Sequence, residues 1–67
     1  MPKKVREMVR IVEDDGWKEV SREGSHRQYK HPVKRGRVTI PGKLGDDIHP
    51  KTERSIFKQA QIERKEQ

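Results

Sequence analysis

The residues best suited to chemistry lie in one short run, Gly24-Ser25-His26-Arg27-Gln28-Tyr29-Lys30-His31-Pro32. Histidine is the side chain whose unperturbed pKa lies near neutrality, so it can accept or release a proton at cellular pH. His26 follows a Gly-Ser pair that is typical of a tight turn. The cations around it in the sequence are Arg22, Arg27 and Lys30. A histidine among cations suits a phosphodiester substrate, because the cations attract phosphate while the imidazole handles the proton.

Size and composition limit what this chain can be. Its 67 residues suffice for one small domain, and only 27% are hydrophobic, so the core must be small and the stability modest. The net charge of +6 points to a polyanion such as nucleic acid, although a well-solvated surface would also account for it. The absence of cysteine excludes disulfides, thiolate metal sites and cysteine nucleophiles. No apolar stretch approaches membrane-spanning length and no signal-peptide core follows the basic start, so we expect a cytoplasmic protein.

Hydrophobic spacing predicts the elements that must position these residues. The first apolar stripe recurs at helical spacing through Val5, Met8, Val9 and Val12. It predicts a helix over about 3–15, ended by Gly16. Three short strands are expected at 17–22, 27–31 and 37–40, joined as hairpins because the connections are too short for crossovers. After a loop, Pro50 suits the first position of a second helix.

Each helix carries one apolar stripe, so both must cover the same face of the sheet to share a core. The expected fold is therefore α+β in the order α-β-β-β-α, with two helices on one face of a three-stranded antiparallel sheet. The other face is left to solvent, which a small antiparallel sheet tolerates when that face is polar. We expect residues 1–62 to form this domain and the tail at 63–67 to fray, because the tail has no core-directed residue.

The chain resembles the HicA (YcfA-like) family of small RNA-cleaving toxins over nearly its whole length. The matching segments follow the family's order and spacing: the first helix, Gly16-Trp17, Gly24-Ser25-His26 with Tyr29-Lys30-His31-Pro32, Val38-Thr39-Ile40-Pro41, and 52–62. The resemblance implies a double-stranded-RNA-binding-domain-like fold, metal-independent cleavage of mRNA without a cofactor, and silencing by a HicB antitoxin. Family members often carry a histidine shortly after the third strand's proline, where this chain has Lys43. A phosphate-binding cation is expected at that position rather than a second proton-transfer group.

With this resemblance, His26 is the expected catalytic residue. RNA can cut itself when its 2′-hydroxyl attacks the adjacent phosphorus, and His26 would take the hydroxyl proton while nearby cations stabilise the developing charge. The expected RNA contacts are Gly24, Ser25, Arg22, Arg27, Lys30, Lys43 and Lys51. Residues 26 and 31 differ by an odd number, so in a regular strand they point to opposite faces. We therefore expect His31 to be structural or merely adjacent, and catalysis to use one histidine.

Other candidate sites are weaker. His49 precedes Pro50 and could hold a phosphate together with Lys51, or it could simply start the helix, and both interpretations stay open. No metal site is expected, because the three histidines lack closely spaced carboxylates and Asp46-Asp47 suits the dipole of the following helix. No glycine-rich loop of the nucleotide-binding kind is present in the sequence.

Three functions fit these residues. The first is the toxin of a type II toxin-antitoxin system, a metal-independent endoribonuclease (mRNA interferase) whose partners are mRNA and a HicB-like antitoxin. The second is a non-catalytic RNA-binding module of the same fold, in which His26 contacts a 2′-hydroxyl or a phosphate. The third is a protein-interaction domain whose basic surface binds an acidic partner and needs no RNA.

Overall fold

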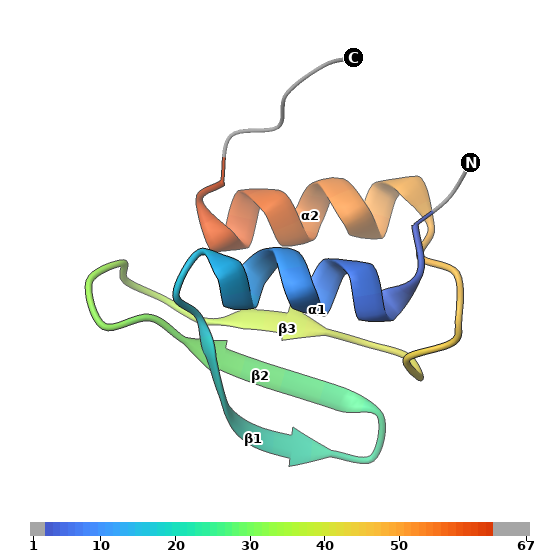
Figure 1. Ribbon diagram of the computed structural model, residues 1–67, viewed down its shortest axis with the longest axis horizontal. Helices are drawn as coiled ribbons and strands as arrows, with labels where there is room; N and C mark the ends of the chain where they lie inside the picture. Colours follow the sequence, from blue (N-terminus) through green and yellow to red (C-terminus); the bar gives the residue numbers. More distant parts are fainter. Residues whose placement is uncertain (1–2, 63–67) are drawn as a thin grey trace.

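The computed structural model describes residues 3–62 of the chain. These residues form two helices and three strands in the order α1 (Val5–Asp14), β1 (Lys18–Glu23), β2 (His26–Lys30), β3 (Val38–Ile40) and α2 (Pro50–Ala60). The strands build one antiparallel sheet in the order β1-β2-β3. Both helices lie on one side of the sheet and run in the same direction (Figure 1). The expected α+β fold is confirmed, while the tail at 63–67 lies outside the described residues.

The loop between β3 and α2 holds the start of α1. The main-chain N–H of Val5 donates to the carbonyl of Asp46 at 2.9 Å, and that of Arg6 donates to the carbonyl of Leu44 at 3.1 Å. These bonds satisfy N–H groups that the first turn of a helix cannot satisfy itself. At the other end, Gly16 has a φ of +108° and ends the helix, as expected. The loop after β3 is thereby fixed against the helical layer.

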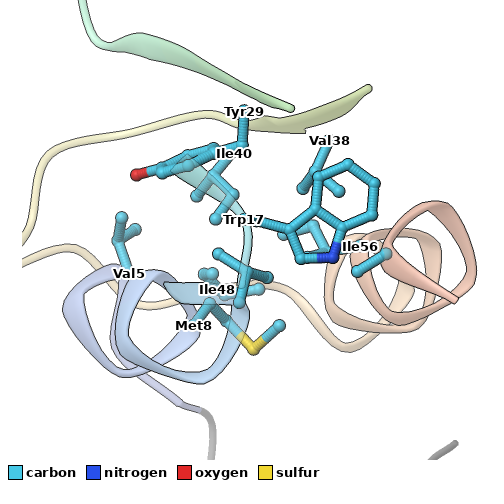
Figure 2. Packing of buried hydrophobic residues seen from close by; sticks show 10 residues of the cluster. Val5, Met8, Trp17, Tyr29, Val38, Ile40, Ile48 and Ile56 are labelled. Carbon is cyan, nitrogen blue, oxygen red and sulfur yellow. The ribbon is translucent and has the colours of Figure 1, made fainter. Parts of the chain in front are cut away.

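The hydrophobic core lies between the sheet and the two helices (Figure 2). Its largest side chains are those of Trp17 and Tyr29, whereas Phe57 packs at its margin. β2 alternates regularly, because Arg27 and Tyr29 are buried while residues 26, 28 and 30 lie on the other side of the sheet. All six residues of β1 are exposed, and this strand lies farthest from the helices (Figure 1). Among the described residues, neither helix is long and apolar enough to cross a membrane.

The strand boundaries differ from the expected ones by about one residue, and the difference matters at β2. β1 begins one residue later than expected because Trp17 is turned into the core. A two-residue turn, Gly24-Ser25, lets His26 pair directly with Glu23. The φ of +61° at the glycine suits the first central position of a type II′ turn, whose twist matches that of the strands. His26 is therefore the first paired residue of β2 rather than a loop residue.

Candidate active site

The ring of His26 is presented on the sheet face that no helix covers. His26 is exposed, and its strand neighbour Arg27 is buried on the helical side, so the alternation of β2 directs the two side chains to opposite faces. Glu23 is its direct cross-strand partner and shares the open face. None of the hydrogen bonds found within residues 3–62 involves the imidazole of His26. The ring is thus placed for contact with a ligand rather than for packing.

Arg27 points inward and ties two segments together. Only 7% of this residue is exposed, and its Nη1 donates to the carbonyl of Gly42 at 2.7 Å and to the carbonyl of Ser25 at 3.3 Å. One carbonyl belongs to the turn before His26 and the other to the loop after β3. The sequence suggested Arg27 as a contact for RNA, yet the structure uses its guanidinium to join the turn to this loop.

Lys43 lies one residue beyond the carbonyl that Arg27 binds. Its main-chain N–H donates to Asp46 Oδ2 at 3.1 Å, which closes the loop on itself. Gly42 adopts a φ of +91°, and a Cβ at this position would lie 3.3 Å from a methyl group of Val5, so the loop also packs closely on α1. The exposed side chain of Lys43 therefore projects from a backbone that is held relative to the turn.

Arg22 lies on the other side of the sheet from His26. Its Cα partner is Arg27, which faces the helices, and its guanidinium makes a two-pronged ion pair with Glu19 at 2.8 and 3.0 Å. The hydrogen bond from Arg22 holds the pKa of the Glu19 carboxyl below its ordinary value. Both side chains are solvent-exposed, so the pair contributes little stability. The structure does not bring Arg22 to the imidazole.

Two further cations expected to contact RNA lie away from the histidine. Lys30 shares the open face but is four residues along β2 from His26, about 13 Å at the rise of a strand. Lys51 lies in the first turn of α2, on the helical layer. Its main-chain N–H donates to Nδ1 of His49 at 3.1 Å, so the side chain of His49 caps this helix.

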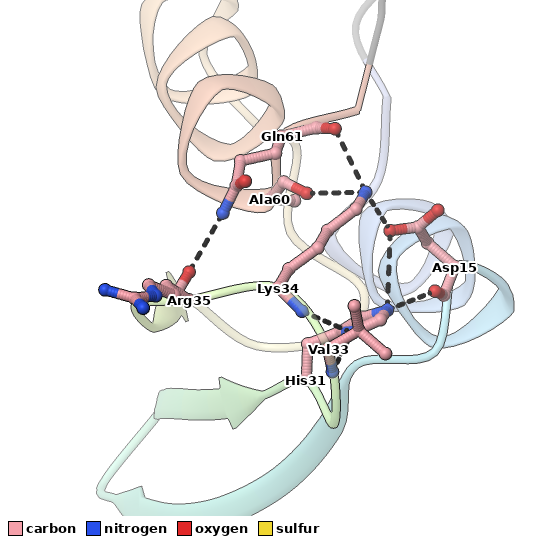
Figure 3. A network of polar contacts seen from close by, with 7 residues as sticks. All are labelled: Asp15, His31, Val33, Lys34, Arg35, Ala60 and Gln61. Carbon is pink, nitrogen blue, oxygen red and sulfur yellow. Dashed lines mark hydrogen bonds and ion pairs between the residues drawn. The ribbon is translucent and has the colours of Figure 1, made fainter.

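His31 belongs to a separate polar network below the helix ends (Figure 3). Its Nδ1 accepts the main-chain N–H groups of Val33 and Lys34, each at 3.0 Å, so in the neutral ring the hydrogen lies on Nε2. That nitrogen donates to the carbonyl of Asp15 at 2.7 Å, and the ring packs edge-on against Trp17 with centroids 5.2 Å apart. This position agrees with the expectation that the two histidines lie on different faces.

The same network contains a lysine that sequence reasoning missed. Nζ of Lys34 donates to Asp15 Oδ2 at 2.6 Å and to the carbonyls of Ala60 and Gln61 at 3.2 and 3.0 Å (Figure 3). The hydrogen bond from this ammonium holds the pKa of the Asp15 carboxyl below its ordinary value of 3.8. One side chain thus connects the end of α1, the β2–β3 loop and the end of α2. No spacing in the sequence indicates contacts between residues so far apart.

The site therefore consists of the Gly24-Ser25 turn, the exposed ring of His26, and the loop of Lys43 held by the buried Arg27. Within the described part of the chain, no group of three or more histidine and carboxylate side chains could hold a metal ion. An exposed imidazole can move a proton and an exposed lysine can attract an anion, and the hydrogen bonds of Arg27 and Asp46 hold the backbone segments that carry them.

Two of three comparisons with known proteins found a match. A family model described as the HicA toxin of bacterial toxin-antitoxin matches residues 5–62. The match begins with the first residue of α1 and ends one residue after Gln61, the C-cap of α2. Among solved structures, the chain is similar to a toxin-antitoxin complex from Streptococcus pneumoniae, with a TM-score of 0.72 and 32% identity over 91% of this chain and 100% of that chain. A comparison with curated proteins found no matching relative. Because the family model spans both helices, the sheet and the Gly-Ser-His turn, the chain belongs to the HicA toxin family.

Proposed function

We propose that this chain is the toxin of a type II toxin-antitoxin system and that it cleaves mRNA with His26 as its single catalytic histidine. Membership of the HicA toxin family supports the first part. The observation that carries the second part is the position of His26, an exposed imidazole on the first paired residue after a tight turn. A ring in this position can approach the 2′-hydroxyl of a bound ribose without any rearrangement of the core.

The proposed reaction is a transesterification that needs no metal. The imidazole of His26 takes the proton of the 2′-hydroxyl, and the 2′-oxygen attacks the adjacent phosphorus while the bond to the 5′-oxygen breaks. The products are a 2′,3′-cyclic phosphate and a 5′-hydroxyl, whose proton comes from water, a lysine or the imidazolium. Lys43 stabilises the additional charge on phosphorus, and Arg27 positions the turn and the loop relative to each other.

The proposed partner is a HicB-like antitoxin that covers the basic surface and blocks the substrate. The similar Streptococcus pneumoniae protein was solved in a toxin-antitoxin complex. This chain offers such a partner both positive charge and apolar area, because Val20, Val33 and Leu44 are exposed large hydrophobic residues. Gel filtration with and without the product of the neighbouring gene tests the association.

Cleavage is tested with purified protein and labelled mRNA in EDTA, with detection of fragments that end in 2′,3′-cyclic phosphate. His26→Ala is expected to lower the cleavage rate at least about 10²-fold, because a positioned general base supplies this much. Arg10→Ala, on the exposed side of α1, is the control and should cleave at the normal rate. Circular dichroism must show native folds for both variants. Full activity in His26→Ala, or RNA that is shifted but intact with the unmodified protein, would favour a non-catalytic binding module.

A further inference from the structure

The open face of the sheet carries a row of cations at the end away from His26. Lys18 and Lys30 are direct cross-strand partners on β1 and β2. The β2–β3 ladder ends with the pair of Tyr29 and Val38, and Lys30 and Arg37 are the residues that follow and precede this pair. Nη1 of Arg37 donates to Oε1 of Gln28 at 2.8 Å, which fixes its guanidinium on the face that Gln28 and His26 share. The three cations Lys18, Lys30 and Arg37, termed the sheet row, thus lie on β1, on β2 and immediately before β3.

Among the described residues, none of the cations of the sheet row is paired with an acidic side chain, in contrast to three lysines of the helical side. Within residues 3–62, none of the ion pairs involves Lys18, Lys30 or Arg37. On the helical side, three lysines are paired with acids: Lys3 with Glu53, Lys4 with Asp47, and Lys34 with Asp15. Positive charge is therefore retained at the end of the open face away from Glu23, where it can attract a polyanion.

We propose that the open face is a track for single-stranded RNA, in which the sheet row binds backbone phosphates on one side of the bond that is cut at His26. This inference rests on the proposed function and assigns the path of its substrate. The row lies about 13 Å along β2 from the imidazole, so it reaches phosphates beyond the cleaved one. Phosphate binding at this distance aligns the RNA without occupying the reacting centre.

A single strand fits this face better than a duplex. In-line attack requires the 2′-oxygen, the phosphorus and the leaving oxygen to align, and the fixed geometry of an A-form duplex opposes this arrangement. The polar side chains of Gln28, Ser21 and Thr39 lie between the sheet row and the histidine. The described part of the open face holds no aromatic side chain for stacking, because Trp17 and Tyr29 are buried and Phe57 packs at the margin of the core on α2. Binding should therefore be sequence-tolerant and strongly dependent on salt.

A second basic surface provides a matched control. Lys51, Arg54 and Lys58 are exposed along α2 and carry the same charge as the sheet row. α2 lies on the helical layer, so phosphates bound there would be on the other side of the sheet from the ring of His26 (Figure 1). An RNA strand bound at His26 can follow the sheet row without crossing from the open face of the sheet to the helical layer.

The test measures binding rather than cleavage, in a His26→Ala background so that RNA stays intact. Two triple variants are compared by fluorescence anisotropy on a short labelled uridine oligomer at several salt concentrations. Lys18→Gln/Lys30→Gln/Arg37→Gln is expected to reduce the slope of log affinity against log salt by about two units and to weaken binding at least about tenfold. Lys51→Gln/Arg54→Gln/Lys58→Gln should change the dissociation constant by less than about twofold, although the net charge falls equally. All the replaced residues are exposed, and urea melts verify folding.

Three results would overturn the proposal. They are an equal or larger loss of affinity in the α2 variant, unchanged RNA affinity in the sheet variant, and stronger binding of duplex RNA than of the single strand. If the variant with the sheet row replaced keeps its affinity for RNA and loses only its affinity for the antitoxin, this face belongs to the protein partner instead. Absence of cleavage by the unmodified protein would count against the proposed function alone, because the binding measurement does not depend on it.

Discussion

Arg27 donates a 2.7 Å hydrogen bond to the carbonyl oxygen of Gly42, fifteen residues further along the chain. The same nitrogen lies 3.3 Å from the carbonyl of Ser25, so one buried guanidinium joins the turn before His26 to the loop of Lys43. A residue next to the candidate catalytic histidine, in a chain with a net charge of +6, is thus used for internal support. Its planar set of donors can satisfy two carbonyl groups, which a lysine ammonium on a flexible stem does less well.

The first prediction concerns Arg27→Lys, which keeps the charge and removes the fork of donors. We expect cleavage to fall about 10- to 100-fold, because the turn and the loop lose their fixed separation. Affinity for RNA, measured in the His26→Ala background, should stay within about twofold, since the guanidinium does not face the ligand. If Arg27 bound phosphate directly, the lysine would restore cleavage, and that result would contradict the positioning role.

The second prediction concerns His31→Ala, which removes the acceptor of two main-chain N–H groups and the donor to the carbonyl of Asp15. Leaving the part-buried carbonyl of Asp15 and N–H of Lys34 without partners should lower the free energy of unfolding by about 1–3 kcal/mol in urea titrations. The cleavage rate per folded molecule should be unchanged. A folded variant as inactive as His26→Ala would show instead that the reaction uses both histidines.

The third prediction follows from the depressed pKa of Asp15. The hydrogen bond from Lys34 holds this pKa below its ordinary value of 3.8, so the ionised carboxylate favours the folded state. The contribution is fully present above about pH 3.8, the value in the unfolded chain, and is lost as pH falls through the lower folded value. Urea unfolding of the unmodified protein and of Asp15→Asn should show a stability difference that narrows below about pH 4.

Lys34→Gln is the matched control for this pH dependence, because it removes the ammonium and leaves the carboxylate. Its stability should fall less steeply between about pH 4 and pH 2 than that of the unmodified protein, since the pKa of Asp15 then returns towards 3.8. A stability difference between the unmodified protein and Asp15→Asn that stayed constant into acid would contradict the assigned role of the ion pair.

Local patterns in the sequence determined the elements and the candidate histidine. The apolar spacing that begins at Val5, the stop at Gly16 and the start at Pro50 are signals carried within a few residues, and the structure places the helix ends there to within two residues. The turn before His26 is also local, because a glycine in the first central position accepts the positive φ that a two-residue hairpin needs. The odd spacing of His26 and His31 predicted their different faces because successive side chains of a strand point to opposite sides of the sheet.

Tertiary structure alone decided which cations face the ligand. β2 is too short and too polar for its alternation to reveal which side is buried, so packing against the helices was needed to show that Arg27 turns inward. The sheet row depends on strand register and on the bulge at Val20, since a slip of one residue would move every side chain to the other face. The contact of Lys34 with Asp15 joins residues nineteen apart. Sequence periodicity reflects local geometry, whereas ion pairs between distant segments form only in the folded tertiary structure.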